Sequence, residues 1–167
     1  MEFVGKVAIV TGAAGGIGRA VAAALAREGC ALVLTYRTAA AEAQAAAEAL
    51  RAAGRRALAV QVDVAEEAQV VAMVQQAEEV LGGVDILVNN AGMVQRAAFT
   101  DLGEEDWRQM LDVSLLGAVR CVRAVLPALR RRGGGAIARR PPPAGSTNSK
   151  AAPITAATAS GTWRIHH

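Results

Sequence analysis

A glycine-rich octet, TGAAGGIG at residues 11–18, constrains the possible folds of this chain more than any other feature of its sequence. It directly follows the apolar run KVAIV at 6–10, which has the length and composition of a buried strand. It also opens the alanine-rich stretch from Gly16 to Glu28, which we expect to be helical. A strand, a glycine-rich turn and a helix in this order are typical of a nucleotide-binding βαβ unit.

The glycines of the octet have distinct physical roles in such a unit. Gly12 permits a tight turn, Gly16 lets the backbone approach a pyrophosphate, and Gly18 lets the helix pack closely against the strand. The helix N-terminus adds free N–H groups and a partial positive charge for the phosphates. The octet therefore predicts nucleotide binding, and the alternative is an ordinary turn between a strand and a helix.

The rest of the chain repeats the alternation of short apolar runs and helical stretches. This alternation predicts an α/β fold, a Rossmann-type doubly wound parallel sheet with the strand order 3-2-1-4-5. At 167 residues the chain is long enough for one domain. The expected strands are 6–10, 30–36, 56–62 and 85–90, and the expected helices are 16–28, 39–53, 66–81 and 104–132.

The last of these helices is unusually long for a single surface helix. We expect it to begin after Gly103 and to kink at Pro127, because proline removes a backbone donor inside a helix. A fifth strand should begin at Gly135 and end early, since the prolines at 141–143 cannot donate to a central ladder.

The composition changes after the fifth predicted strand. Residues 1–137 contain 14 Lys and Arg against 15 Asp and Glu, whereas residues 138–167 contain four Lys and Arg and no acid. We expect a dinucleotide-binding domain at 1–137 and an aberrant, poorly ordered remnant of a catalytic segment at 138–167. Since the excess basic charge belongs to this tail and no aromatic residues are interleaved with it, we expect no nucleic-acid partner.

Several other classes of protein are disfavoured. No apolar run approaches the roughly 18–20 residues that cross a bilayer, and the N-terminus lacks the pattern of a signal peptide. Cys30 and Cys121 stand in no metal-binding or redox spacing. We therefore expect a cytoplasmic protein with two buried thiols, no bound metal and no membrane partner.

Three ordered motifs make the chain resemble the short-chain dehydrogenase/reductase family, and in particular its 3-oxoacyl-(acyl-carrier-protein) reductase branch. The motif Thr-Gly-x-x-x-Gly-x-Gly reads TGAAGGIG at 11–18, with Ile17 before its last glycine, and Asn-Asn-Ala-Gly reads NNAG at 89–92. The pair Asp63-Val64 follows the third predicted strand and resembles the family's adenine-contacting site. The resemblance extends from about Val4 to Ile137.

The end of the second predicted strand bears on the choice of cofactor. An acid there favours the ribose 2′-hydroxyl of NAD, and a nearby Arg favours the 2′-phosphate of NADP. The sequence gives Arg37 and Thr38, with no acid before Glu42, so NADP is favoured over NAD; the alternative is that Arg37 is a solvated loop cation. The predicted cofactor-binding residues are Gly12, Gly16, Ile17, Gly18, Arg37, Thr38, Asp63, Val64, Asn89, Ala91 and Gly92.

The family's catalytic residues have no counterpart here. The resemblance implies hydride transfer to a carbonyl, with a proton from tyrosine, a lysine four residues later that lowers the tyrosine pKa, a serine and an asparagine. The family's register, laid on Ile137, places the serine at Pro142, the tyrosine at Thr155 and the lysine at Ala159. Ser114 stands where the family usually has asparagine. We therefore predict no catalytic residues.

Two other interpretations of the tail are open. Ser146 and Lys150 repeat the tyrosine–lysine spacing with serine in place of tyrosine, about nine residues too early. Alternatively, a local frame error or premature end altered residues 138–167. On that view the chain is truncated, the sheet is incomplete on its C-terminal side, and the fifth strand becomes an exposed edge.

By ancestry the chain resembles an NADP-dependent reductase of 3-oxoacyl or similar carbonyl substrates, inactive as written. The alternatives are a nucleotide-binding pseudoenzyme and a non-functional truncated fragment. The expected partners are the dinucleotide and, through the helix at 104–132, a second copy of the chain.

Overall fold

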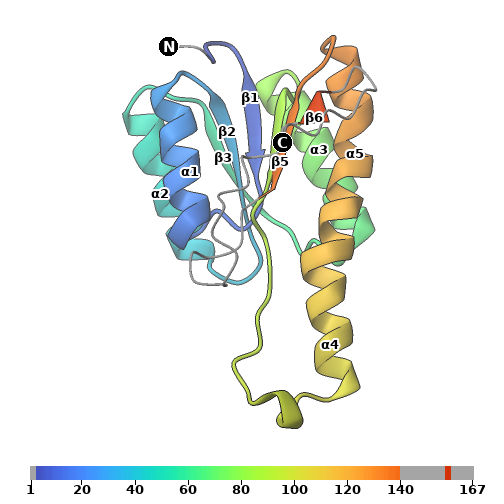
Figure 1. Cartoon of the computed structure of the whole chain (residues 1–167). Helices are drawn as coiled ribbons and strands as arrows, with labels where there is room; N and C mark the ends of the chain where they lie inside the picture. Colours follow the sequence, from blue (N-terminus) through green and yellow to red (C-terminus); the bar gives the residue numbers. More distant parts are fainter. Residues whose placement is uncertain (1–2, 140–156, 159–167) are drawn as a thin grey trace, which may run out of the picture.

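A computed structural model describes residues 3–139 and 157–158 (Figure 1). Its elements are β1 (Val7–Val10), α1 (Gly16–Arg27), β2 (Ala31–Tyr36), α2 (Ala40–Ala52), β3 (Ala57–Gln61), α3 (Glu67–Leu81), β4 (Ile86–Asn89), η1 (Phe99–Asp101), α4 (Glu104–Leu111), η2 (Asp112–Leu116), α5 (Gly117–Arg131), β5 (Ala136–Arg139) and β6 (Ala157–Thr158). The predicted strands and helices are therefore present at the expected places, with bounds that differ by one or two residues.

The strands form one sheet in the order β3-β2-β1-β4-β5-β6. All pairings among the first five strands are parallel, which confirms the predicted order 3-2-1-4-5 and the Rossmann-type fold. The order reverses between β1 and β4, so the connections that leave these two strands run to opposite faces of the sheet.

The sheet is buried on both faces because successive strand residues point to opposite sides. Val7 and Ile9 pack in a cluster with residues of α3 and α5, whereas Ala8 and Val10 pack in a second cluster with residues of α1 and α2. Figure 1 shows the two layers, with α1 and α2 on one side of the sheet and α3 and α5 on the other. This explains why the strands read as continuous apolar runs.

The fifth strand is not the edge of the sheet, so that expectation was wrong. β6 pairs antiparallel with β5, with Ala136 opposite Thr158 and Ile137 opposite Ala157. An edge strand presents unpaired N–H and C=O groups, and here a later segment of the same chain satisfies part of them. β5 starts at Ala136, one residue later than expected, and continues past the domain boundary expected after Ile137 to Arg139.

The long helix begins at Glu104 as predicted, and its hydrogen-bond pattern changes at η2, where no irregularity was predicted. η2 is a π-helical turn, in which the N–H of Gly117 donates to the carbonyl of Asp112 five residues earlier. That carbonyl also accepts a hydrogen bond from Arg120 at 3.3 Å, and the Asp112 carboxylate pairs with Arg120 at 2.7 Å. Pro127 lies inside α5, which continues to Arg131.

The two cysteines, Cys30 and Cys121, are both free and buried, as expected. Burial raises the pKa of Cys121 to about 11, although the nearby charge of Arg120 opposes the rise.

Among the helices within 3–139, none has the length and apolar composition needed to cross a bilayer.

Asp85, just before β4, ties the amino end of the sheet together. Its carboxylate is 2% exposed and accepts hydrogen bonds from the Val7 N–H at 3.0 Å, from Lys6 at 3.1 Å and from Arg132 at 3.1 and 3.3 Å. Burial alone would raise the pKa of Asp85, but the hydrogen bonds from Arg132, Val7 and Lys6 outweigh burial and hold the pKa below its usual value. The carboxylate joins β1, β4 and the end of α5.

The substitution Asp85→Asn should lower the free energy of unfolding by about 1–3 kcal/mol at pH 7, because the charged acceptor is lost while the side-chain volume is kept. The folded-state pKa is depressed, so the stabilisation is fully present above the unfolded-state pKa of about 4 and is lost as the pH falls through the lower folded-state value. Urea unfolding at pH 7, 5 and 3 measures the difference between the two proteins. We expect that difference to shrink only at the lowest pH; a constant difference would contradict the assigned role of the charge.

Candidate functional site

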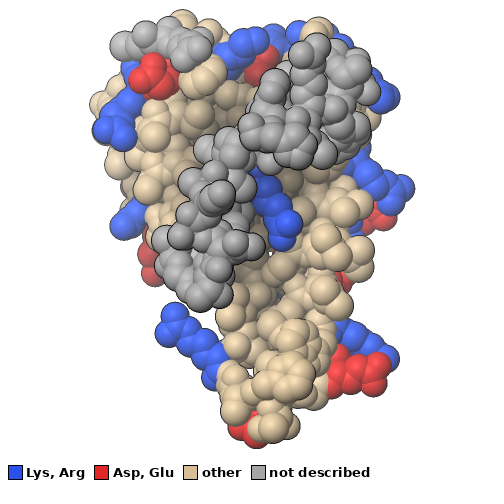
Figure 2. Space-filling model, viewed as in Figure 1, with Lys and Arg blue, Asp and Glu red and all other residues tan. Residues whose placement is uncertain are grey.

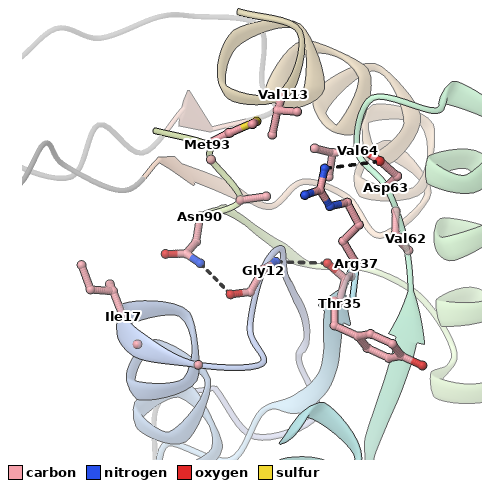
Figure 3. Close-up of a pocket in the computed structure, with 15 residues that line it drawn as sticks. Gly12, Ile17, Thr35, Arg37, Val62, Asp63, Val64, Asn90, Met93 and Val113 are labelled. Atoms are coloured by element: carbon pink, nitrogen blue, oxygen red, sulfur yellow. Dashed lines mark hydrogen bonds and ion pairs between the residues drawn. The ribbon is translucent and has the colours of Figure 1, made fainter. Parts of the chain in front are cut away.

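A cavity of about 330 Å³ opens at the carboxyl ends of β1, β2 and β4, where the strand order reverses (Figure 3). In open α/β sheets this crevice is the usual place for a ligand. The cavity is lined by Gly12, Gly15, Gly16, Ile17, Thr35, Tyr36, Arg37, Val62, Asp63, Val64, Asn90, Ala91, Gly92, Met93 and Val113.

One wall of the cavity is the glycine-rich turn and the start of α1. Gly12 and Gly16 have positive φ values of 65° and 55°, which side-chain-bearing residues rarely adopt. A Cβ atom built on Gly16 meets no atom of the described residues within 4 Å, apart from its chain neighbours and the backbone of its own helix. Gly15 precedes the helix and provides no capping side chain. The first N–H groups of α1 are therefore open to an anion.

Gly18 lies behind this wall and is buried. A Cβ atom at this position would lie 2.5 Å from the carbonyl oxygen of Gly12 and 2.5 Å from the amide nitrogen of Asn90. The structure thus gives Gly18 a packing role, since only glycine lets α1 approach the loops after β1 and β4 this closely.

The floor of the cavity is held by Thr11, which directly follows β1. Its hydroxyl accepts hydrogen bonds from the backbone N–H groups of Asn90 at 3.0 Å and Ala91 at 2.9 Å, and donates to the carbonyl of Val88 at 3.3 Å. The Asn90 amide donates in return to the carbonyls of Thr11 at 2.9 Å and Gly12 at 3.0 Å. These bonds fix the loop after β1 against the loop after β4.

Two further polar groups complete this part of the site. The Thr35 hydroxyl at the end of β2 accepts a hydrogen bond from the Gly12 N–H at 3.2 Å, as the dashed line in Figure 3 shows. The side-chain carbonyl oxygen of Asn90 is buried and has no partner among the described residues. A buried acceptor without a partner is costly, so the two donor bonds of the same amide, to Thr11 and Gly12, have to offset that cost.

The opposite wall of the cavity contains Arg37 and Asp63, which follow β2 and β3. The guanidinium of Arg37 lies 3.9 Å from the carboxylate of Asp63 (Figure 3). Val64, the next residue, is buried against the long helix, since a Cβ atom on Gly117 would lie 2.7 Å from its side chain. The π-helical turn η2 thus ends at the point where the helix touches this wall.

The structure brings most of the predicted site residues to this cavity. Eight line it: Gly12, Gly16, Ile17, Arg37, Asp63, Val64, Ala91 and Gly92. Three do not: Gly18, Thr38 and Asn89. Gly18 is a packing residue, Asn89 is buried at the end of β4, and Thr38 is exposed beside the start of α2, where its carbonyl accepts a hydrogen bond from Ala40.

Sequence reasoning assigned no site role to several lining residues: Gly15, Thr35, Tyr36, Val62, Asn90, Met93 and Val113. The positions of Thr35 and Asn90 in the sequence could have indicated a site role, because each is a polar residue at the carboxyl end of an apolar strand. Nothing in the sequence indicates a site role for Met93 or Val113, because only the fold brings the loop after β4 next to η2.

Of the positions aligned with the family's catalytic residues, only Ser114 falls within the described residues. Its hydroxyl accepts a hydrogen bond from the Met93 N–H at 3.0 Å and lies 3.3 Å from the Met93 carbonyl, to which it donates. Ser114 therefore ties η2 to the rim of the cavity. Pro142, Thr155, Ala159 and the alternative pair Ser146 and Lys150 lie outside the residues that the structure describes.

Comparison with known proteins agrees with this architecture. A sequence model of the family described as short chain dehydrogenase matches residues 6–158. The chain belongs to the short-chain dehydrogenase family. The matched range includes residues beyond Ile137, where we expected a remnant of the catalytic segment.

The chain is similar to an uncharacterized oxidoreductase of Methylorubrum extorquens, 45% identical over 120 residues that make up 72% of this chain and 48% of the relative. A 3-oxoacyl-(acyl-carrier-protein) reductase of Staphylococcus aureus is 33% identical over 156 residues, 93% of this chain and 63% of the relative. The chain thus spans about half to just under two thirds of the length of these relatives.

Two solved structures resemble this one. A short chain dehydrogenase from Burkholderia cenocepacia in complex with NADP has a TM-score of 0.74 and 38% identity, over 77% of this chain and 52% of that one. A 3-ketoacyl-ACP reductase from Sinorhizobium meliloti has a TM-score of 0.75 and 37% identity, over 80% of this chain and 52% of that one.

Proposed function

We propose that this short-chain dehydrogenase binds NADP(H) in the cavity at the carboxyl ends of β1, β2 and β4. The observation that carries the proposal is the pairing, in one cavity, of an uncapped helix N-terminus with an arginine at the end of β2. The first suits a pyrophosphate and the second a 2′-phosphate. The complex of a structural neighbour with NADP supports the same cofactor.

The lining residues fit the parts of a dinucleotide. The open backbone at Gly16 leaves space where a side chain would stand, and the first turn of α1 contains no acidic residue to repel phosphates. Asp63 and Val64 would meet the adenine, and Arg37 the phosphate on its ribose. Ala91 and Gly92, which line the cavity after β4, would face the second ribose. When bound, NADPH supplies a hydride for the reduction of a carbonyl carbon.

The cofactor site can be tested with Gly16→Val and Arg37→Gln. Gly16→Val should abolish binding of NADPH and NADH, because the side chain fills the space that the pyrophosphate needs. Arg37→Gln should weaken NADPH about 10- to 100-fold and NADH little, since only NADPH loses a charge-assisted hydrogen bond. Titration of the reduced-nicotinamide fluorescence gives both dissociation constants.

The matched control for Gly16→Val is Gly54→Val. Gly54 also has a positive φ, 76°, and no atom of the described residues near its Cβ position, but it follows α2 and does not line the cavity. This variant likewise places a β-branched residue at a positive φ and should still bind both cofactors. Equal losses of NADPH and NADH in Arg37→Gln would contradict the 2′-phosphate assignment.

We propose further that the 167-residue chain binds the cofactor without reducing a carbonyl substrate. Its single tyrosine, Tyr36, lies at the end of β2, and Lys6 is bonded to Asp85 at the opposite end of the sheet. The sequence offers no Tyr-x-x-x-Lys pair to donate a proton to the carbonyl oxygen. A 3-oxoacyl thioester is the substrate to test, given the reductases among the relatives.

NADPH consumption with a 3-oxoacyl thioester should therefore stay at background, since general acid catalysis typically contributes about 10²–10⁴-fold. The double variant Thr155→Tyr, Ala159→Lys should also stay near background, because Pro142 has no hydroxyl for the carbonyl oxygen. The Staphylococcus aureus reductase is the positive control. Robust turnover by the unaltered chain would show that other residues donate the proton.

A second copy of the chain is the partner we propose for the long helix. Large apolar side chains recur every four residues along it, at Trp107, Leu111, Leu115 and Val119, and each is 41–54% exposed. α4 has no buried residue and projects past the sheet (Figure 1), and uncharged surface covers much of this region in Figure 2. Exposed apolar surface of this kind is stabilised by burial, and a face that packs against a copy of itself gives a symmetric dimer.

The double substitution Leu111→Glu, Leu115→Glu should shift the chain toward monomer, because it places charges inside the proposed contact. Sedimentation velocity at several concentrations measures the change in association. The control is Val80→Glu, which adds a charge at an equally exposed valine on α3. A chain that is already monomeric at high micromolar concentration would rule out this partner.

A further inference from the structure

Arg37 and Asp63 are the only charged residues among the described residues that line the cavity. The nearest nitrogen and oxygen of the two side chains are 3.9 Å apart, too far for a hydrogen bond. The Arg37 side chain is 57% exposed and that of Asp63 is 30% exposed. Such a loose, solvated pair contributes little free energy, so a stronger anion can displace the carboxylate from the guanidinium.

Hydrogen bonds within its own loop hold Asp63 in place more firmly than the contact with Arg37 does. Its second oxygen accepts a hydrogen bond from the Ala65 N–H at 2.9 Å, and the Asp63 N–H donates to the side-chain oxygen of Gln69 at 2.8 Å. The amide of Gln61, at the end of β3, donates to the carbonyl of Arg37, which follows β2, at 3.0 Å. The backbones are therefore fixed, and the long arginine side chain is the part that can turn.

We infer that the Asp63 carboxylate sets how strongly the cavity distinguishes a 2′-phosphorylated adenine nucleotide from an unphosphorylated one. This inference rests on the proposed binding of NADP(H) at Arg37. A 2′-phosphate has to accept hydrogen bonds from guanidinium N–H groups that now face Asp63, so the Arg37–Asp63 attraction is lost. The bound phosphate then lies within a Debye length of the fixed negative charge of Asp63 and is repelled by it. A ribose without the phosphate causes neither free-energy cost. Asp63 thus weakens binding of the phosphorylated ligand selectively and limits the preference that Arg37 creates.

The substitution Asp63→Asn removes the charge and keeps an oxygen that accepts from Ala65. Isothermal titration of the 167-residue chain with adenosine 2′,5′-bisphosphate and with 5′-AMP isolates the 2′-phosphate, the group by which the two probes differ. Asp63→Asn should raise the ratio of bisphosphate affinity to 5′-AMP affinity about three- to tenfold, because any change in the contact of this side chain with the adenine affects both probes alike and cancels in the ratio.

Two variants serve as controls. Asp63→Ser keeps a side-chain oxygen for the local turn, so it tests the same charge if Asp63→Asn folds poorly. Glu79→Gln makes the same change of net charge near the far end of α3, about 18 Å along the helix from its first residue and beyond the Debye length. It should leave the ratio of the two affinities unchanged.

A higher ratio of bisphosphate to 5′-AMP affinity in Asp63→Asn or Asp63→Ser, absent in Glu79→Gln, supports the inference. An unchanged ratio in both Asp63 variants, or the same rise in Glu79→Gln, overturns it, because the Asp63 charge then has no selective effect. An unchanged ratio still leaves the proposed NADP site standing if Arg37→Gln weakens the bisphosphate. If Arg37→Gln changes neither probe, the proposed site fails and the inference fails with it.

Discussion

The hydroxyl group of Thr11 holds β1 and β4 together at the point where the sheet must open for a ligand. The connections after these strands run to opposite faces, so the ordinary ladder of hydrogen bonds ends there. The Thr11 hydroxyl takes the place of the ladder. It accepts hydrogen bonds from the N–H groups of Asn90 and Ala91 and donates one to the carbonyl of Val88, which uses both of its acceptor sites and its one donor. The glycine-rich turn can then curve away to α1 while its origin stays fixed.

The order and type of the elements were predictable because they depend on local patterns. Apolar runs gave the strands, alanine-rich stretches the helices, and the glycine-rich octet the first crossover, which together allow few topologies. The pairing of β6 with β5 was missed because it joins segments distant in sequence. The π-helical turn was missed because one extra residue in a long helix barely alters the apolar pattern.

The candidate site was partly predictable for the same reason. Backbone-defined positions such as Gly12 and Gly16 follow from their place between a strand and a helix. Contacts between side chains on different elements do not, because they depend on register and on helix position. The pair of Arg37 and Asp63 is an example: each residue was expected in the site separately, but only the alignment of β2 with β3 brings their charges 3.9 Å apart.

The π-helical turn also sets the rotation of α4 about the helix axis. Each residue of an α-helix advances the chain by about 100°. Regular α-helical bonding through 112–116, with the same number of residues, would turn α4 by about that angle relative to α5. Trp107 and Leu111 would then no longer share a face with Val119, and Ser114 would be carried away from Met93. The wider hydrogen-bond pattern of this turn therefore couples the outer surface of the long helix to the rim of the cavity.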